Sequence, residues 1–181
     1  MLRHNRITVS LLVSLFLLCG HASSQTAPSR LRYGDMMPSL AGQTLSGMWV
    51  DLPQATGGKP AVVVFSFSRA GGRDAQSWTQ HLSADNPGLT IYTVIFLEGV
   101  PRLFRSMAVS GIKSEMPAAM QDKTVLLYRD EQLWKQRLQL GDERHACVAL
   151  IGVHGEIRWM ASDSFTDPRY SELGKMIVAL K

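Results

Sequence analysis

The chain has 181 residues, of which 45% are hydrophobic and 19% are charged, and its formal net charge is +4 at pH 7. This is the composition of a globular protein, and the length suits one domain with a targeting segment. The sequence contains no run of lysine and arginine of the kind that follows a phosphate backbone, so we expect no nucleic-acid binding.

Residues 1–24 have the three-part layout of a secretory signal peptide. A short basic stretch is followed by an almost wholly apolar run over residues 7–18, and small residues come next. The apolar run is shorter than the roughly 20 residues that a membrane span needs. We therefore expect cleavage before Gln25, a periplasmic or secreted mature protein, and no stable membrane span after cleavage.

Cleavage would change both the charge and the cysteine content. Loss of Arg3 and Arg6 lowers the 19 basic side chains to 17 against 15 acidic ones, a net charge of +2. Loss of Cys19 leaves Cys147 as the one cysteine of the exported chain, which cannot form an internal disulfide. Two alternatives stay open: the segment is retained as an anchor, or Cys19 carries a lipid, although the bulky Leu18 before it is unusual at a lipid-attachment site.

The rest of the chain alternates strand and helix patterns. Residues 25–39 are rich in Ser, Pro and Arg and predict a linker, and residues 40–181 predict the domain, which begins with a hairpin over residues 40–53. Continuous β-branched and aromatic runs further along are typical of strands buried on both faces. These strands are predicted at residues 61–67, 89–97, 124–128, 146–151 and 157–161.

Helices are predicted at residues 75–82, 101–112, 133–138 and 168–180. Asp74 is placed to cap the first of them, behind a glycine-containing loop over residues 68–73. Pro101 suits the first turn of the second helix, with Arg102 and Arg105 turned away from its apolar face. That apolar face carries Leu103, Phe104, Met107, Ala108 and Ile112.

This alternation predicts an α/β fold, in which a central and mostly parallel sheet has helices on both faces and an antiparallel edge. Three segments carry a likeness to known proteins: the strand 62–67 with the loop and helix that follow it, residues 124–140, and the closing hairpin 147–157. Together they resemble the thioredoxin-like superfamily, in its peroxiredoxin and periplasmic thiol-reductase branch. The resemblance implies a thioredoxin-like fold over roughly residues 40–180.

The resemblance does not extend to the residues that carry the superfamily's thiol chemistry. Its members carry Cys-x-x-Cys, or a lone peroxidatic cysteine, in the loop after the first long strand, and this chain has no cysteine over residues 68–74. The two cysteine positions fall near Gly71 and Asp74, and Ala146 stands where the superfamily has a cis-proline. Because thiol exchange needs a thiolate at a helix N-terminus, the resemblance implies a relative without that activity.

Shorter segments resemble a second family. A strand ending in Phe-Ser, a Ser-Trp pair in the next helix and a late Ile-Arg-Trp, within residues 65–78 and 156–159, resemble the mitochondrial ATP synthase assembly factor family. Those proteins are also similar to thioredoxin relatives without an active cysteine pair. We therefore predict a non-catalytic binding or assembly module for another exported or membrane protein, with no cofactor and no metal.

The predicted binding site is the groove that thioredoxin relatives use to hold an extended segment. Free N–H groups at the start of the helix, together with two arginines, suit an anion or a partner's carboxylate. The residues of this predicted site are Ser68, Arg69, Gly71, Gly72, Arg73, Asp74, His145 and Ala146.

Two other functions stay open. Cys147 could serve a thiol–disulfide oxidoreductase or a peroxiredoxin-like enzyme, although free cysteine in an apolar strand commonly packs as a small hydrophobe. His145 is an improbable catalytic partner for it, because strand alternation would place the two side chains on opposite sides. Thioethers could also carry copper together with histidine. The methionines in question are Met36, Met37, Met116 and Met120.

Overall fold

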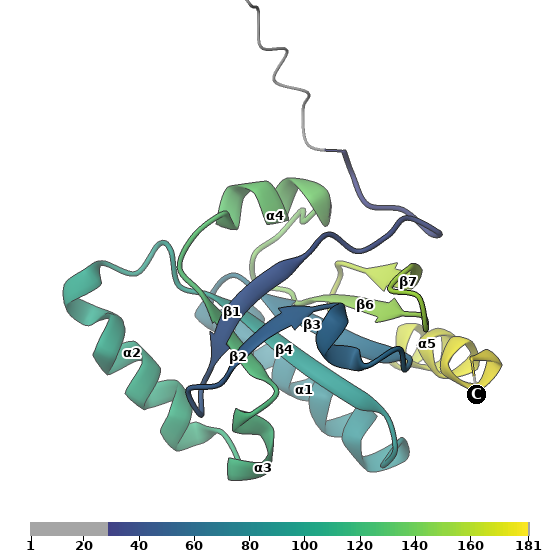
Figure 1. Cartoon of the computed structure of the whole chain (residues 1–181), viewed down its shortest axis with the longest axis horizontal. Helices are drawn as coiled ribbons and strands as arrows, with labels where there is room; N and C mark the ends of the chain where they lie inside the picture. The colour runs from purple at the N-terminus through teal and green to yellow at the C-terminus, as the bar shows by residue number, and fades with distance from the viewer. Residues whose placement is uncertain (1–28, 181) are drawn as a thin grey trace, which may run out of the picture.

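The computed structural model describes residues 29–180. The expected signal peptide, its cleavage site before Gln25, and Cys19 lie outside the described residues. Within them the chain folds around one seven-stranded sheet (Figure 1). The strands are β1 (Leu40–Thr44), β2 (Trp49–Leu52), β3 (Ala61–Ser66), β4 (Thr90–Phe96), β5 (Thr124–Leu127), β6 (Cys147–Ile151) and β7 (Ile157–Ala161). The helices are α1 (Arg69–Asp85), α2 (Arg102–Glu115), α3 (Ala118–Gln121), α4 (Glu131–Arg137) and α5 (Asp167–Ala179), with a 3-10 turn η1 (Gln54–Thr56).

The strand order across the sheet is β2-β1-β5-β4-β3-β6-β7. The central strands β3, β4 and β5 run parallel to one another. The hairpins β1–β2 and β6–β7 extend the sheet on either side in antiparallel pairing. The α/β prediction is confirmed, and the sheet is mixed because both of its ends are built from antiparallel hairpins.

The strand β3 is buried on both faces, as its continuous apolar run predicts. Val62 faces one core cluster, together with Trp78 of α1 and Leu173 of α5. Its neighbours along the strand face the other side, where the ring of Phe65 stacks on Trp134 of α4 with 5.6 Å between the ring centroids. Alternation along β3 therefore fixes helices to both faces of the sheet, as expected.

The described part of the expected linker packs on the domain. Leu31 and Met37 are buried. The Leu31 N–H donates to the carbonyl of Arg137 at 2.8 Å, and the Met37 N–H donates to that of Gly155 at 2.9 Å. Buried side chains and backbone hydrogen bonds therefore hold residues 31–37 against α4 and the β6–β7 turn.

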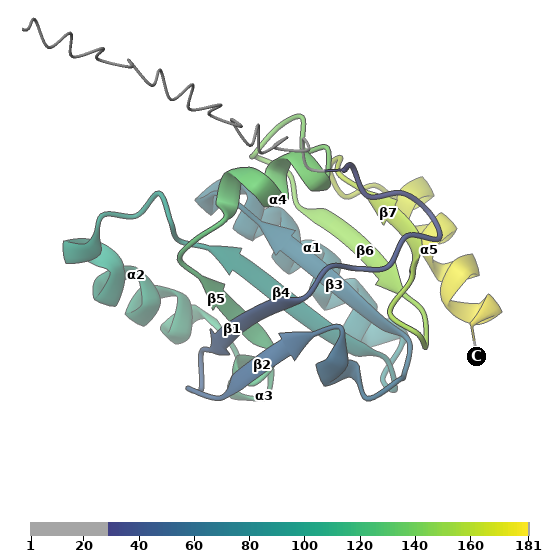
Figure 2. The same ribbon diagram turned by 45° about the horizontal axis from the view of Figure 1, so that its top comes forward.

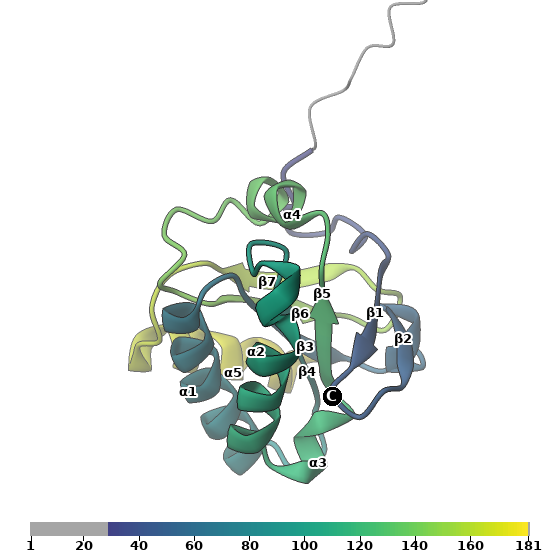
Figure 3. The same ribbon diagram turned by 90° about the vertical axis from the view of Figure 1, so that its left-hand side faces the viewer.

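The helix α2 lies on the same side of the sheet as α1 (Figure 3). Its inward-facing residues Val109 and Ile112 pack around Leu126 of β5, together with Met116 directly after the helix. The predicted apolar face was wrong in its first part, because Leu103, Phe104 and Met107 are 83%, 51% and 67% exposed. This helix has apolar residues on two sides, so periodicity alone does not determine which side meets the sheet.

Among the described residues, no helix combines the length and the apolar character that a bilayer span requires.

Candidate functional site

The predicted binding residues meet where the carboxyl end of β3 enters α1 and the segment 142–146 enters β6. Ser68 is the N-cap of α1, and its Oγ accepts a hydrogen bond from the Gly71 N–H at 3.0 Å. The same hydroxyl donates to the carbonyl of Glu143 at 2.6 Å. A side chain that caps a helix therefore also ties it to a segment 75 residues further along the chain.

The expected loop over residues 68–73 is the first turn of α1, so that expectation was wrong. The Gly71-Gly72 pair suggested a loop, but Gly71 lies within the helix, at a position where neighbouring backbone leaves no room for a side chain. A Cβ at Gly71 would lie 2.7 Å from the carbonyl oxygen of Glu143 and 3.2 Å from that of His145. A Cβ at Gly72 would meet nothing within 4 Å. Close approach of two backbones, rather than a turn, thus explains the first glycine.

Asp74 is not the N-cap that the sequence predicted. Its carboxylate accepts hydrogen bonds from the Ala146 N–H at 2.8 Å and from the Phe165 N–H at 3.1 Å. These donors lie at the start of β6 and in the connection from β7 to α5. Asp74 therefore joins three segments of the chain around the first turns of α1, a role that local sequence does not reveal.

The predicted site residues differ in what they can offer a partner. Gly71 and Ala146 are buried, and the Ala146 N–H is already bonded to Asp74. Arg69 and Arg73 are exposed on the first two turns of α1, and His145 is half-buried. The surface that remains open to a partner is thus a basic patch beside the start of α1, rather than a deep groove.

Lys135 of α4 lies beside this site and was not predicted from the sequence. Its Nζ donates to Glu131 at 2.6 Å and to Glu143 at 2.7 Å, and it lies 5.7 Å from the centroid of the Phe67 ring. Burial lowers the pKa of this lysine, but the hydrogen bonds with Glu131 and Glu143 outweigh burial and raise it. The spacing of four residues could have revealed the pair with Glu131, whereas the pair with Glu143 depends on the fold.

Cys147 lies in the core. Its side chain is fully buried, at the position of β6 that pairs with Phe65 of β3. Burial, and then the negative charge of Asp163, raise the pKa of the thiol far above its ordinary range. A neutral, inaccessible thiol is neither a nucleophile nor a metal ligand.

The methionines proposed for copper do not gather in one place. Met36 and Met37 lie in the N-terminal segment beside Gly155, and Met37 is buried. Met116 packs against the cluster under α2. Within residues 29–180, no three histidine, cysteine or carboxylate side chains are grouped so that they could hold a metal ion.

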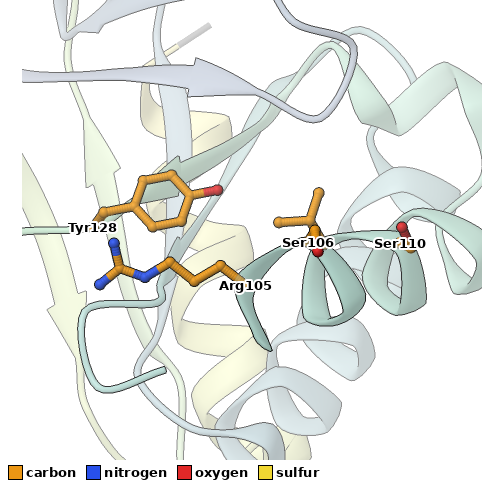
Figure 4. A pocket seen from close by; sticks show the side chains of 5 residues that line it. Arg105, Ser106, Ser110 and Tyr128 are labelled. Atoms are coloured by element: carbon orange, nitrogen blue, oxygen red, sulfur yellow. The ribbon is translucent and has the colours of Figure 1, made fainter. Parts of the chain in front are cut away.

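An open depression lies between α2 and the end of β5, lined by Arg105, Ser106, Val109, Ser110 and Tyr128 (Figure 4). The guanidinium of Arg105 lies 5.1 Å from the centroid of the Tyr128 ring. Its Nε donates to the carbonyl of Val100 at 2.9 Å, and a terminal nitrogen donates to that of Glu98 at 3.3 Å. Arg105 therefore fastens the start of α2 to the loop before it.

Comparisons with known proteins agree with this architecture. A family model described as "ATP10 protein" matches residues 30–180. A search of curated proteins finds no match. Among solved structures, a protein described as thiol:disulfide interchange protein DsbE from Chlorobium tepidum is similar with a TM-score of 0.61 and 17% identity, covering 83% of this chain and 98% of that one.

Two further structures support the same fold. The thioredoxin domain of a thiol-disulfide oxidoreductase from Bacteroides vulgatus is similar with a TM-score of 0.57 and 23% identity, covering 81% of this chain and 99% of that one. BsSco, a member of the Sco family of cytochrome c oxidase assembly proteins, is similar with a TM-score of 0.55 and 12% identity, covering 83% and 98%. At these identities the likeness shows the thioredoxin-like fold, and the fold alone does not determine function.

Proposed function

The chain belongs to the ATP10 protein family, and from that premise we propose that it is an exported, non-catalytic module that binds or helps to assemble another exported or membrane protein. One observation carries the proposal. At the start of α1, where thioredoxin-like enzymes have their reactive cysteines, this chain has side chains that hydrogen-bond to backbone groups of neighbouring segments. Ser68 and Asp74 use their side-chain oxygens on backbone groups of the segments around α1. No thiol stands there to exchange, and the one cysteine of the described residues is buried.

The basic patch of Arg69 and Arg73 is the part of this site that a partner can reach. Both side chains are exposed at the N-terminal end of α1, where the helix dipole favours negative charge. The first turn of α1 contains no acidic residue of its own. We therefore expect the bound segment of the partner to carry carboxylates, with its affinity falling as salt rises.

Export is part of the same proposal. It depends on the signal-peptide layout of residues 1–24 and predicts a mature N-terminus at Gln25 in the periplasm or in the medium. Cell fractionation followed by N-terminal sequencing tests this. A full-length chain recovered from the cytosol would contradict it.

Partner capture tests the binding role. A photo-reactive residue at Gly72, which has open space around it, is placed in the wild type, in Cys147→Ser and in the double variant Arg69→Glu/Arg73→Glu. Lys59→Glu/Lys175→Glu serves as the matched charge reversal away from the patch, because both lysines are exposed. We expect one cross-linked partner in the wild type, in Cys147→Ser and in the control, and its loss on reversal at the patch.

Two results would contradict the proposal. A partner that is released by reductant and absent from Cys147→Ser would establish thiol chemistry through Cys147 instead. A partner retained equally by both charge-reversed proteins would remove the patch from the binding surface.

A further inference from the structure

The helix α2 has two apolar sides and uses only one of them. Its inner side packs on the sheet through Val109 and Ile112, yet none of its residues is fully buried. The outer side presents Leu103, Phe104 and Met107, with exposed fractions of 83%, 51% and 67%. Single exposed apolar residues are ordinary, but three large ones within five positions of one helix form a contiguous patch, which is typical of an interaction surface.

The position of this helix in the molecule favours contact with a fluid layer over contact with a protein surface of fixed shape. Figures 1 and 2 show α2 at one end of the molecule's long axis, with the N-terminal end of the helix projecting furthest. The three residues lie in that projecting half. A projecting apolar end suits insertion into a fluid layer, whereas a protein partner would need a matching hollow.

The size of the patch points the same way. Three side chains expose roughly a few hundred Å² of apolar surface. A stable interface between two copies of a protein needs about 800 Å² from each partner. A lipid layer has no such minimum, because each apolar group that enters it contributes on its own.

The charge around the patch is complementary to an anionic surface. Exposed Arg102 lies beside the patch at the projecting end of the helix, whereas Lys113 and Glu115 lie together in its last turn. Pro101 provides no side-chain cap and the first turn has no acidic residue, so no side chain of the helix itself compensates the positive end of its dipole. The Glu98 carboxylate, in the loop before α2, accepts a hydrogen bond from the N–H of Glu131 at 2.7 Å, so it lies at the start of α4.

Arg105 serves a different purpose from Arg102. Its hydrogen bonds to the carbonyls of Val100 and Glu98, and its position over the Tyr128 ring, hold the start of α2 in place. These contacts of Arg105 hold the projecting half of the helix against the domain, so that the three exposed side chains on its other side point away from the domain.

We propose that the outer side of α2 is a docking surface for an anionic lipid bilayer. Leu103, Phe104 and Met107 enter the headgroup region, and Arg102 meets lipid phosphates. This surface is separate from the basic patch at the start of α1, so it would hold the protein at a membrane while that patch stays free for a partner. It does not depend on the proposed function.

Hydrogen–deuterium exchange of the full chain, with and without vesicles rich in phosphatidylglycerol, tests this. Exchange is read from peptides within residues 102–115, so any membrane affinity of the apolar run 7–18 does not enter the readout. We expect slower exchange in α2 with anionic vesicles and little change with phosphatidylcholine alone. High salt should reverse the effect, because exposed charges are then screened.

The decisive variant is the triple change Leu103→Ser/Phe104→Ser/Met107→Ser. All three side chains are exposed, so the domain should fold as before, which circular dichroism checks. We expect it to lose the protection of α2 and to weaken α2-dependent vesicle binding at least about tenfold. The matched control is Val178→Ser in α5, which removes an apolar side chain that is 69% exposed and should change nothing.

Two outcomes would overturn the proposal. The first is unchanged exchange in α2 while the protein is bound to vesicles. The second is protection of α2 that rises with protein concentration in the absence of lipid, which would assign this side to self-association.

Discussion

Two helices of this protein follow parallel neighbouring strands and lie on the same side of the sheet, yet they are held in opposite ways. The helix α1 buries five residues, among them Trp78 and Leu82, and its first turn is hydrogen-bonded to two distant segments. The helix α2 has no buried residue and presents a second apolar side to its surroundings.

The contrast separates stability from recognition. Changes near the start of α1 break contacts that the folded state needs, so they should lower the free energy of unfolding. Changes on the outer side of α2 remove side chains that touch little in the domain, so they should alter binding alone. Comparing equivalent changes in the two helices is therefore the most direct way to test this division.

Truncation of one aromatic residue in each helix gives the largest expected difference. Trp78 is fully buried, with its ring 5.0 Å from Phe165 and 6.1 Å from Trp159. We expect Trp78→Ala to lower the free energy of unfolding by about 3–5 kcal/mol, because it leaves a cavity. Phe104→Ala should change it by less than about 0.5 kcal/mol. Urea unfolding measures both.

The m-value, the slope of the unfolding free energy against urea concentration, serves as the control. It should be similar for both variants if the folded and unfolded states keep their compactness. A loss at Phe104 as large as that at Trp78 would mean that the outer side of α2 is covered in solution, and the division between the two helices would fail.

Removal of the Asp74 carboxylate should have the next largest effect. Asp74→Ala leaves the N–H groups of Ala146 and Phe165 without their acceptor, and we expect a loss of about 2–4 kcal/mol. Asp74→Asn keeps one acceptor oxygen and should lose less. Normal stability of Asp74→Ala together with weaker partner capture would instead place this side chain in the binding surface.

The two adjacent glycines of α1 provide a smaller and sharper test. Gly71→Ala places a methyl group 2.7 Å from the Glu143 carbonyl and should lower stability by about 1–3 kcal/mol, because the segment before β6 must move. Gly72→Ala meets open space within a helix and should raise stability by up to about 1 kcal/mol. Equal effects at both positions would show that the contact with residue 143 is not maintained in solution.

The sequence predicted well those features that depend on neighbouring residues. The run from Val62 to Phe67 identified a strand buried on both faces. The strands and the α/β class followed from the same local patterns. Both depend on residue types at fixed short spacings, which a single sequence contains.

The candidate site could be predicted only in part, because its geometry depends on long-range contacts. Asp74 bonds to groups 72 and 91 residues away, so its local context suggested a cap instead. Gly71 looked like a loop residue because the backbone that it approaches is distant in the sequence. The side of α2 that faces the sheet was misassigned for a different reason, namely that two apolar sides satisfy one helical period equally well.

Ionisation of Cys147 has no expected effect on stability near neutral pH and a modest one at high pH, and it bears most directly on function. Burial raises the pKa of its thiol in the folded protein, whereas an unfolded chain would ionise it near pH 8.5. Above that pH the folded state holds one proton more than the unfolded state, so the free energy of unfolding should fall as pH rises. We expect the wild type to lose about 1.4 kcal/mol per pH unit relative to Cys147→Ala above about pH 8.5.

Both proteins are compared in a Cys19→Ser background, so that the thiol difference comes from one position. The same background allows labelling, and a thiol reagent should reach Cys147 only after unfolding, because the side chain has no exposed surface. Parallel pH profiles combined with fast labelling of the folded protein would mean that Cys147 is accessible and ionised. In that case Cys147 would be a reactive thiol. The non-catalytic function proposed above would then be contradicted.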